Sequence, residues 1–118
     1  MNLLIDCIQM KVIAIPKVYD YLENLVTTLY EEGYFGLKTS ARKYVDDLFD
    51  DITTNLPVRQ HKPAPKHFDK YGKGMKYAVF KKSKRTAWYV FFKTYEKNGE
   101  IIYLVRYIAN NHVIAQYL

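Results

Sequence analysis

The sequence predicts an α+β domain in which a two-helix hairpin packs on one face of a small antiparallel sheet. Apolar residues recur at spacings of three and four over residues 17–32 and 40–55, which places them along one face of a helix. From residue 77 onward, runs of β-branched and aromatic residues alternate with turn residues, as in antiparallel strands. Helices that precede strands in this way are typical of an α+β layer. The 118 residues suffice for one core, so we expect residues 1–118 to form a single domain.

The first strand is expected at residues 11–15, a β-branched run that ends at Pro16. Residues 3–15 also fit one longer strand, and residues 1–9 are interpreted as a possible N-terminal extension. Each of the two helices that follow has a single apolar stripe. The stripe of the first helix consists of Val18, Leu22, Leu25, Val26 and Leu29. The stripe of the second consists of Ala41, Tyr44, Val45, Leu48, Phe49 and Ile52.

A polar and basic segment, residues 57–75, separates the helices from the remaining strands. It holds three of the four prolines, and an irregular loop of this length suggests a function of its own. Strands are then expected at residues 77–80, 86–95 and 101–109. Asn98-Gly99 predicts a tight hairpin between the last two. The element order is therefore β-α-α-β-β-β, and the tyrosine-rich sheet face away from the helices is expected to be open to a partner.

The net charge of +6 is distributed unevenly along the chain. Residues 1–56 hold 5 basic and 9 acidic residues, a net charge of −4, whereas residues 57–118 hold 13 basic and 3 acidic residues, a net charge of +10. Such asymmetry favours a surface for an anionic partner, most commonly a nucleic acid. An uneven but merely solvated surface is the alternative.

The composition excludes several other classes of protein. The single cysteine, Cys7, permits no disulfide within the chain and no cysteine-based metal site. The segment MNLLIDCIQM is too short to span a membrane and lacks the features of a signal peptide. We therefore expect a cytoplasmic protein with no membrane contact, no cofactor and no metal.

The element order and four stretches of the chain resemble the RelE/ParE superfamily of bacterial toxins. The opening strand and first helix correspond to KVIAIPKVYDYLENLV, and the second helix to KTSARKYVDDLFDDI. The central hairpin corresponds to KYAVFKKSKRTAWYVFF, and the closing strand and tail to IIYLVRYIANNHVIAQYL. The resemblance covers residues 11–118.

This resemblance implies the toxin of a type II toxin–antitoxin pair, held inactive by a cognate antitoxin protein. The RelE branch cuts mRNA in the ribosomal A site without a metal, so a ribosome-dependent endoribonuclease is the first expectation. The ParE branch inhibits DNA gyrase and needs no catalytic residues, which makes a gyrase inhibitor the second. A non-enzymatic module that binds nucleic acid through its basic half is the third.

A ribonuclease of this kind activates a 2′-OH, stabilises charge on the phosphoryl oxygens and protonates the leaving 5′-oxygen. Lysine and arginine suit the charge stabilisation, and an imidazole can move protons near neutral pH. The catalytic candidates are Lys81, Lys84, Arg85, Arg106, His112 and Tyr117. The resemblance implies that Lys81 and Arg85 match the basic residues of the family's catalytic strand, and that Tyr117 lies near its C-terminal tyrosine.

Each of these candidates also has a purely structural interpretation. The basic residues of the 81–85 segment would also keep a hairpin turn in water. Arg106 can pair with an acid across the sheet, and His112 can form a turn with the two asparagines before it. Tyr117 also fits the packing of an apolar tail.

Six lysines are predicted to contact RNA phosphates. They are Lys62, Lys66, Lys70, Lys73, Lys76 and Lys82. His61 and His67 lie in the basic loop of residues 57–75 and are expected to accompany its four lysines, with a disordered loop as the alternative. These four are Lys62, Lys66, Lys70 and Lys73.

The sequence departs from the family pattern at two places. Ala87-Trp88 occupies the position where the family often has arginine, and an Asn-Asn-His run follows the last strand in place of a basic cluster. These departures keep the gyrase-type hypothesis open. The acidic residues of the second helix are interpreted as a solvated face or an antitoxin contact rather than as a metal site, because Arg42 and Lys43 precede two of them by one turn.

Overall fold

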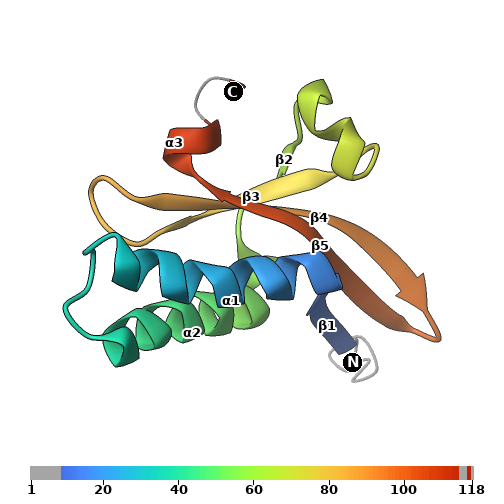
Figure 1. The fold of residues 1–118 in the computed structure, drawn as a ribbon. Helices are drawn as coiled ribbons and strands as arrows, with labels where there is room; N and C mark the ends of the chain where they lie inside the picture. The colour runs from blue at the N-terminus through green and yellow to red at the C-terminus, as the bar shows by residue number, and fades with distance from the viewer. Residues whose placement is uncertain (1–8, 115–116, 118) are drawn as a thin grey trace.

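The computed structural model describes residues 9–114 and Tyr117 as an α+β fold with one mixed sheet. Figure 1 shows α1 and α2 on one face of the sheet, and α3 with the segment around β2 on the other. The elements in chain order are β1 (Gln9–Ala14), α1 (Pro16–Glu31), α2 (Lys38–Asn55), η2 (Leu56–Val58), β2 (Lys62–Pro63), η3 (Lys66–Tyr71), β3 (Lys76–Lys81), β4 (Ala87–Lys97), β5 (Glu100–Asn110) and α3 (Asn111–Ile114). The predicted extension, apart from Gln9, lies outside the described residues.

The sheet has the strand order β1-β5-β4-β3-β2 within the described residues. β3, β4 and β5 form the predicted antiparallel meander, and Asn98 (φ 53°) and Gly99 (φ 76°) form its predicted tight turn. The prediction of a wholly antiparallel sheet is wrong, because β1 pairs with β5 in parallel. The helical hairpin carries the chain across to the far side of the sheet, so the last strand returns beside the first in the same direction.

The main core lies between the helices and the sheet and confirms both predicted apolar stripes. Its buried helix residues include Val18, Leu22, Leu25 and Val26 from α1, and Ala41, Val45, Leu48 and Ile52 from α2. Alternate residues of β4, namely Trp88, Val90 and Phe92, complete it from the sheet. This alternation is what a strand with one face on a core requires.

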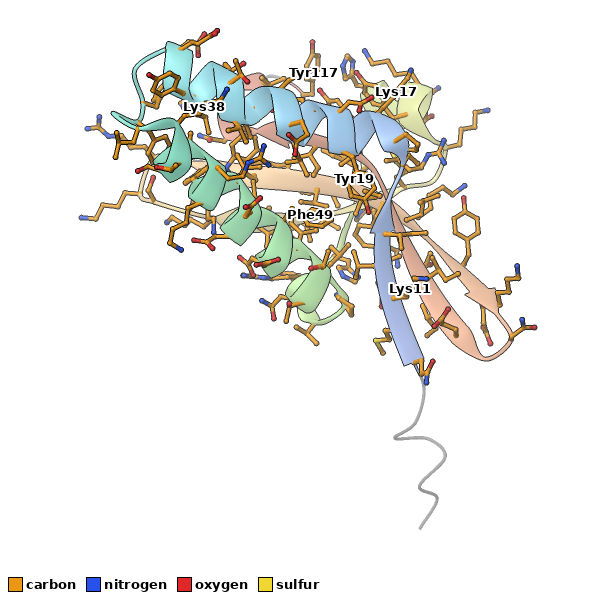
Figure 2. All side chains as sticks on the ribbon, turned by 60° about the horizontal axis from the view of Figure 1, so that its bottom comes forward. Lys11, Lys17, Tyr19, Lys38, Phe49 and Tyr117 are labelled. Atoms are coloured by element: carbon orange, nitrogen blue, oxygen red, sulfur yellow. The ribbon has the colours of Figure 1, made fainter. Side chains whose placement is uncertain are left out.

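The two helices also contact each other along their outer sides. The rings of Tyr19 and Phe49 lie 5.5 Å apart between their centroids, and Figure 2 shows the two side chains next to each other. Arg42 donates two hydrogen bonds of 2.8 Å to the carboxylate of Glu23. These bonds lower the pKa of Glu23. The hairpin of α1 and α2 is therefore joined by apolar contacts inside and by a charged pair outside.

A second core covers part of the opposite sheet face, so the prediction that this face is open is wrong over this area. The segment predicted as an irregular loop forms β2 and η3, and η3 places Phe68 against Phe91 with 4.5 Å between the ring centroids. Phe68 is 2% exposed and Phe91 is fully buried. Met75 and Ile114 complete the cluster from either side. Burial of the Phe68 ring thus holds the segment 57–75, which was predicted to be an irregular loop, against the sheet.

No helix in the described part of the chain is long and apolar enough to cross a membrane.

Replacing Phe68 with alanine tests whether the segment from β2 to η3 is an integral part of the fold. We expect Phe68→Ala to lower the free energy of unfolding by about 3 kcal/mol, because removal of a buried ring leaves a cavity against Phe91. Urea denaturation followed by circular dichroism measures the change. The control is Lys66→Ala, an exposed side chain at the start of η3, which should change stability by less than about 0.5 kcal/mol. Equal effects of the two substitutions would contradict this account.

Candidate functional site

Among the described residues, no strand covers the outer edge of β5 over its second half. β1 pairs with β5 only as far as Ala14 opposite Val105, and the chain then turns into α1 at Pro16. The described part of β5 beyond Val105 therefore faces α1 and open space on this side. A strand edge next to a helix leaves a groove, and two cavities lie along it.

The two cavities share Tyr21 and together form what we call the β5 groove. The Arg106 cavity has a volume of about 330 Å³ and the His112 cavity about 390 Å³. The Arg106 cavity is lined by Ile15, Lys17, Val18, Tyr21, Lys70, Tyr71, Arg106, Tyr107 and Ile108. The lining of the His112 cavity includes Tyr21, Leu25, Tyr34, Tyr44, Lys82, Ser83, Thr86, Asn110 and His112.

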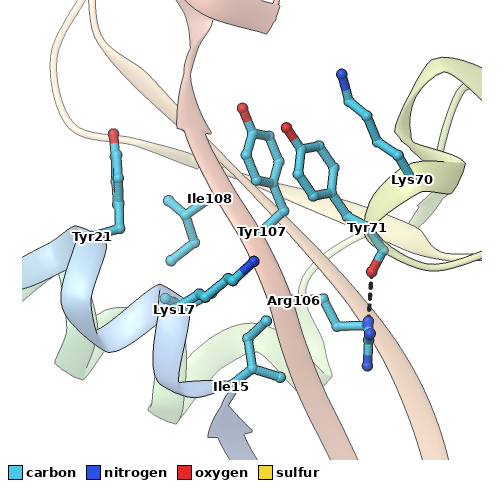
Figure 3. A pocket seen from close by; sticks show the side chains of 9 residues that line it. Ile15, Lys17, Tyr21, Lys70, Tyr71, Arg106, Tyr107 and Ile108 are labelled. Carbon is cyan, nitrogen blue, oxygen red and sulfur yellow. Dashed lines mark hydrogen bonds between the residues drawn. The ribbon is translucent and has the colours of Figure 1, made fainter.

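Arg106 is the extra residue of a β-bulge in β5. Phe91 pairs with Tyr107, whereas Phe92 pairs with Val105, so Arg106 has no partner on β4. Its Nε donates a hydrogen bond of 2.6 Å to the carbonyl oxygen of Tyr71, shown in Figure 3. Bulges re-aim side chains in this way. The guanidinium is thereby fixed at the groove, and no described carboxylate forms an ion pair with it.

Gly72 allows the Arg106 side chain to lie close to the backbone that follows η3. Its φ of 151° lies in the range that favours glycine, and a Cβ at this position would stand 2.9 Å from Nε and 3.1 Å from Cδ of Arg106. A larger residue would push the guanidinium away from the carbonyl of Tyr71. The segment 57–75 therefore positions a groove residue in addition to covering the sheet.

Three tyrosines give the Arg106 cavity its aromatic surface. Tyr71 and Tyr107 stack with 4.0 Å between ring centroids and 7° between planes. Burial, followed by the charge and hydrogen bond of Tyr71, raises the pKa of Tyr107 to about 12. Burial also raises the pKa of Tyr21. Both hydroxyls keep their protons beyond the ordinary range of tyrosine and can donate hydrogen bonds at neutral pH.

Two asparagines hold His112 at the mouth of the second cavity. Asn110 caps α3, because its side-chain oxygen accepts hydrogen bonds from the backbone N–H of His112 (3.0 Å) and of Val113 (3.2 Å). Asn111 connects the end of β5 to the turn between β3 and β4, residues 82–86, which we call the basic hairpin. Its oxygen accepts from Ala87 N–H at 3.1 Å and its nitrogen donates to the Arg85 carbonyl at 3.2 Å. The turn role weighed for the Asn-Asn-His run is present, and it places the imidazole in the groove lining.

The basic hairpin lines the groove with the residues next to its two strands, and Lys84 and Arg85 at its tip line neither cavity. Ser83 accepts hydrogen bonds from the backbone N–H groups of Arg85 and Thr86, and Lys82 N–H donates to the Thr86 carbonyl. This closed turn directs Lys82, Ser83 and Thr86 to the His112 cavity. Below them the indole N–H of Trp88 donates a hydrogen bond of 2.9 Å to the hydroxyl of Tyr44.

The structure separates the predicted catalytic residues into three places. Arg106 and His112 line the two cavities of the groove. Lys81, Lys84 and Arg85 are exposed on the hairpin and line neither cavity. Tyr117 stacks on His67, with 3.6 Å between ring centroids and 9° between planes, and meets the edge of Phe68. The six residues therefore do not form one cluster, and the two in the groove are linked through Tyr21.

The predicted RNA-binding lysines are also divided. Lys70 lines the Arg106 cavity, with its Nζ 5.4 Å from the centre of the Tyr71 ring, and Lys82 lines the His112 cavity. Lys62 lies beside Arg59 in a separate hollow near β2 and β3. The remaining three, exposed on η3 and around the start of β3, are Lys66, Lys73 and Lys76.

The two loop histidines serve packing. His61 donates a hydrogen bond of 2.8 Å from Nε2 to the carbonyl of Leu56, and its ring lies 4.7 Å from that of Phe92 between centroids. His67 lies beneath Tyr117 as described above. Within the described residues, no group of three or more histidine, cysteine, aspartate or glutamate side chains is placed to hold a metal ion.

Sequence reasoning missed several residues of the groove. Lys17 and Tyr21 lie one helical turn apart on α1, beside the buried Val18. Their spacing places both at the border of the apolar stripe, and this position is the sequence signal that could have indicated a role beside the sheet edge. Tyr71 and Tyr107 are brought together by η3 and by the bulge in β5, neither of which has a clear signature in the sequence.

No protein-family model, curated protein or solved structure matches the chain. The resemblance to RelE/ParE toxins therefore depends on the element order and the stretches quoted above, and the function is inferred from the groove itself.

The raised pKa of Tyr107 gives a measurable pH dependence. In the folded state its hydroxyl keeps its proton to about pH 12, whereas in the unfolded chain it ionises near pH 10. The unfolded state therefore binds fewer protons between these values, and the free energy of unfolding falls as the pH rises through this window. Tyrosinate absorbance should show a late ionisation step that disappears in Tyr107→Phe and persists in the control Tyr30→Phe. Loss of this step in the control alone would refute the assignment.

Replacing Gly72 tests the contact that positions Arg106. We expect Gly72→Ala to destabilise the protein by about 1–3 kcal/mol, because the new methyl group displaces the guanidinium and strains the backbone. Gly36→Ala is the matched control, since no atom lies within 4 Å of its added Cβ. In thermal unfolding, part of the loss should be recovered in the double variant Gly72→Ala/Arg106→Ala. Strict additivity of the two substitutions would show that they do not interact.

Proposed function

We propose that the chain is the toxin of a type II toxin–antitoxin pair and acts as a metal-independent, ribosome-dependent mRNA endoribonuclease. The observation that carries this proposal is the composition of the β5 groove. Among the described residues, its Arg106 cavity is lined by three cations and no carboxylate. Its His112 cavity combines an imidazole with Lys82, two hydroxyl side chains of the hairpin and one carboxylate, that of Glu32. Such a groove suits a single RNA strand with its phosphates on the cations.

The chemistry assigned to the groove is transfer of a phosphoryl group from the 5′-oxygen to the neighbouring 2′-oxygen within the RNA strand. His112 takes the proton of a 2′-OH, and the 2′-oxygen forms a bond to the adjacent phosphorus as the bond to the 5′-oxygen breaks. The products are a 2′,3′-cyclic phosphate and a 5′-hydroxyl, whose proton comes from solvent water. The hydroxide that remains takes the proton from His112, which returns the imidazole to its neutral form. Lys82 stabilises the negative charge that develops on the non-bridging oxygens. Arg106, in the neighbouring cavity, holds a phosphate further along the strand.

A ParE-type inhibitor of DNA gyrase is the second candidate function. It is favoured by one observation, the exposed position of Lys81, Lys84 and Arg85 outside both cavities. A protein that blocks an enzyme by binding needs an exposed charged surface rather than a catalytic cluster. In both candidate functions the protein acts in the cytoplasm and a cognate antitoxin covers its charged surface.

Expression from a repressible promoter in bacterial cells tests both functions. We expect the wild-type chain to arrest growth and to cut mRNA within codons, as mapped by primer extension. His112→Ala and Lys82→Ala should each reduce cleavage about 100-fold or more, the usual effect of losing a proton-transferring or charge-stabilising group. Lys97→Ala, an exposed lysine in the hairpin at the other end of β4, is the control and should cleave as the wild type does.

Four other outcomes would change the assignment. If His112→Ala and Lys82→Ala retain full cleavage, the catalytic site lies elsewhere. If cleavage instead depends on Lys84 and Arg85, it lies on the tip of the hairpin. Growth arrest with loss of plasmid supercoiling and intact mRNA would support the gyrase inhibitor, whereas salt-dependent RNA binding without a growth defect would support a non-enzymatic module.

A further inference from the structure

The Arg106 cavity contains a slot between two tyrosine rings. Figure 3 shows Tyr21 edge-on, with its ring face turned toward Tyr107 across the side chain of Ile108. Ile108 is 3% exposed and forms an apolar floor. The two rings are held from different elements, Tyr21 from α1 and Tyr107 from the bulged part of β5. Flat apolar space between two aromatic faces is suited to a planar ring, and nucleobases are the planar rings that RNA presents.

The wall at Tyr107 is rigid. Its ring stacks on that of Tyr71 and lies 5.7 Å from that of the buried Phe91 between centroids. The backbone of Tyr71 is held by the hydrogen bond that its carbonyl accepts from Arg106. The wall at Tyr21 is freer, since this side chain is 37% exposed. A fixed wall and an adjustable one allow a base to enter from solvent and be closed in by Tyr21.

The three charged side chains at this slot, those of Lys17, Lys70 and Arg106, can only donate hydrogen bonds. Lys17 reaches from the start of α1 toward β5 beside Ile108 (Figure 3). Arg106 and Lys70 lie on the far side of Tyr107 in the same cavity. No described carboxylate lines this cavity, and none forms an ion pair with these three residues. A base that turns an edge with only acceptors toward these cations is therefore favoured over a base whose corresponding edge carries an amino group.

We propose that the slot between Tyr21 and Tyr107 binds a guanine base of single-stranded RNA, with Lys17 donating to its acceptor edge. Guanine presents the adjacent acceptors O6 and N7, whereas adenine presents an amino group beside N7. Lys70 and Arg106 hold the phosphates next to this base. This inference rests on the proposed ribonuclease function and adds a base preference to it, set by residues that take no part in the bond-breaking step.

Fluorescence anisotropy with short RNA strands tests the slot directly. The probe is 5′-UUUGUUU-3′ with 2′-O-methyl riboses, which cannot be cleaved, and the comparison strands carry adenosine, inosine or 7-deazaguanosine at the centre. We expect the guanosine strand to bind about tenfold more tightly than the adenosine strand, in line with the cost of one mismatched base-edge contact. Inosine, which keeps O6 and N7, should match guanosine. 7-Deazaguanosine, which lacks N7, should bind with intermediate affinity.

Substitutions separate stacking from edge recognition. Tyr21→Ala should weaken binding of every purine strand about tenfold or more, and Tyr21→Phe should restore it, because stacking requires only the ring. Lys17→Met should remove the preference for guanosine over adenosine while leaving the adenosine affinity nearly unchanged. Tyr30→Ala removes an exposed tyrosine from the same helix, outside both cavities, and should leave all affinities as they are.

The possible failures are distinguishable. Equal affinity for all four strands, with mRNA cleavage intact in cells, would overturn the guanine slot and leave the ribonuclease function standing. Absence of RNA binding at low salt together with absence of cleavage would overturn both. Binding of a glutamate-rich peptide but of none of the RNA strands, with the loss of peptide binding in Lys17→Met, would assign the cavity to an acidic protein partner and overturn the slot.

Discussion

The parallel pairing of β1 with β5 is the constraint on which the functional surface depends. The pairing ends at Val105, and Ile15 N–H donates the last hydrogen bond to the Val105 carbonyl before α1 begins. Since Pro16 starts a helix that crosses the sheet, the rest of β5 keeps a bare edge beside α1. The helix packs on the sheet through Val18 and its stripe, so it stays close enough to form the opposite wall. The groove is thus a consequence of where one strand stops.

The bulge at Arg106 determines what this edge presents. Without it, strict alternation would place residues 105 and 107 on the same face. In the structure Val105 and Ile108 both belong to the helix-side core, whereas Tyr107 packs with the core of the other face. The extra residue therefore turns Arg106 and Tyr107 together toward η3. There the carbonyl of Tyr71 accepts the hydrogen bond from Arg106, and Gly72 leaves room for the arginine side chain because it has no Cβ. Charge and aromatic surface are brought side by side by a single irregularity.

Sequence patterns predicted the elements whose signals are local. The helical stripes and the Asn98-Gly99 turn follow from spacing along the chain. The order of β1 beside β5, the bulge in β5 and the docking of Phe68 depend on contacts between distant segments, which spacing does not encode. The same division holds at the site. Arg106 and His112 stood out as polar residues near an apolar strand, whereas Lys17, Tyr21 and Tyr71 gained their place only through tertiary packing.

The distribution of ion pairs explains why the basic half of the chain keeps its charge available. Every ion pair among the described residues has at least one partner on α2, whose acids are met by Arg42, Lys43 and Arg59. Four of the nine acids in residues 1–56, namely Glu23, Asp46, Asp47 and Asp51, are paired in this way. Lys70, Lys82 and Arg106 form no ion pair within the described part of the chain, and the low-dielectric walls of the groove focus their electric field. A surface needed only for solubility would gain nothing from concentrating unpaired cations in cavities lined with tyrosine. The RNA strand proposed above would use both features, because its phosphates are anionic and its bases are planar.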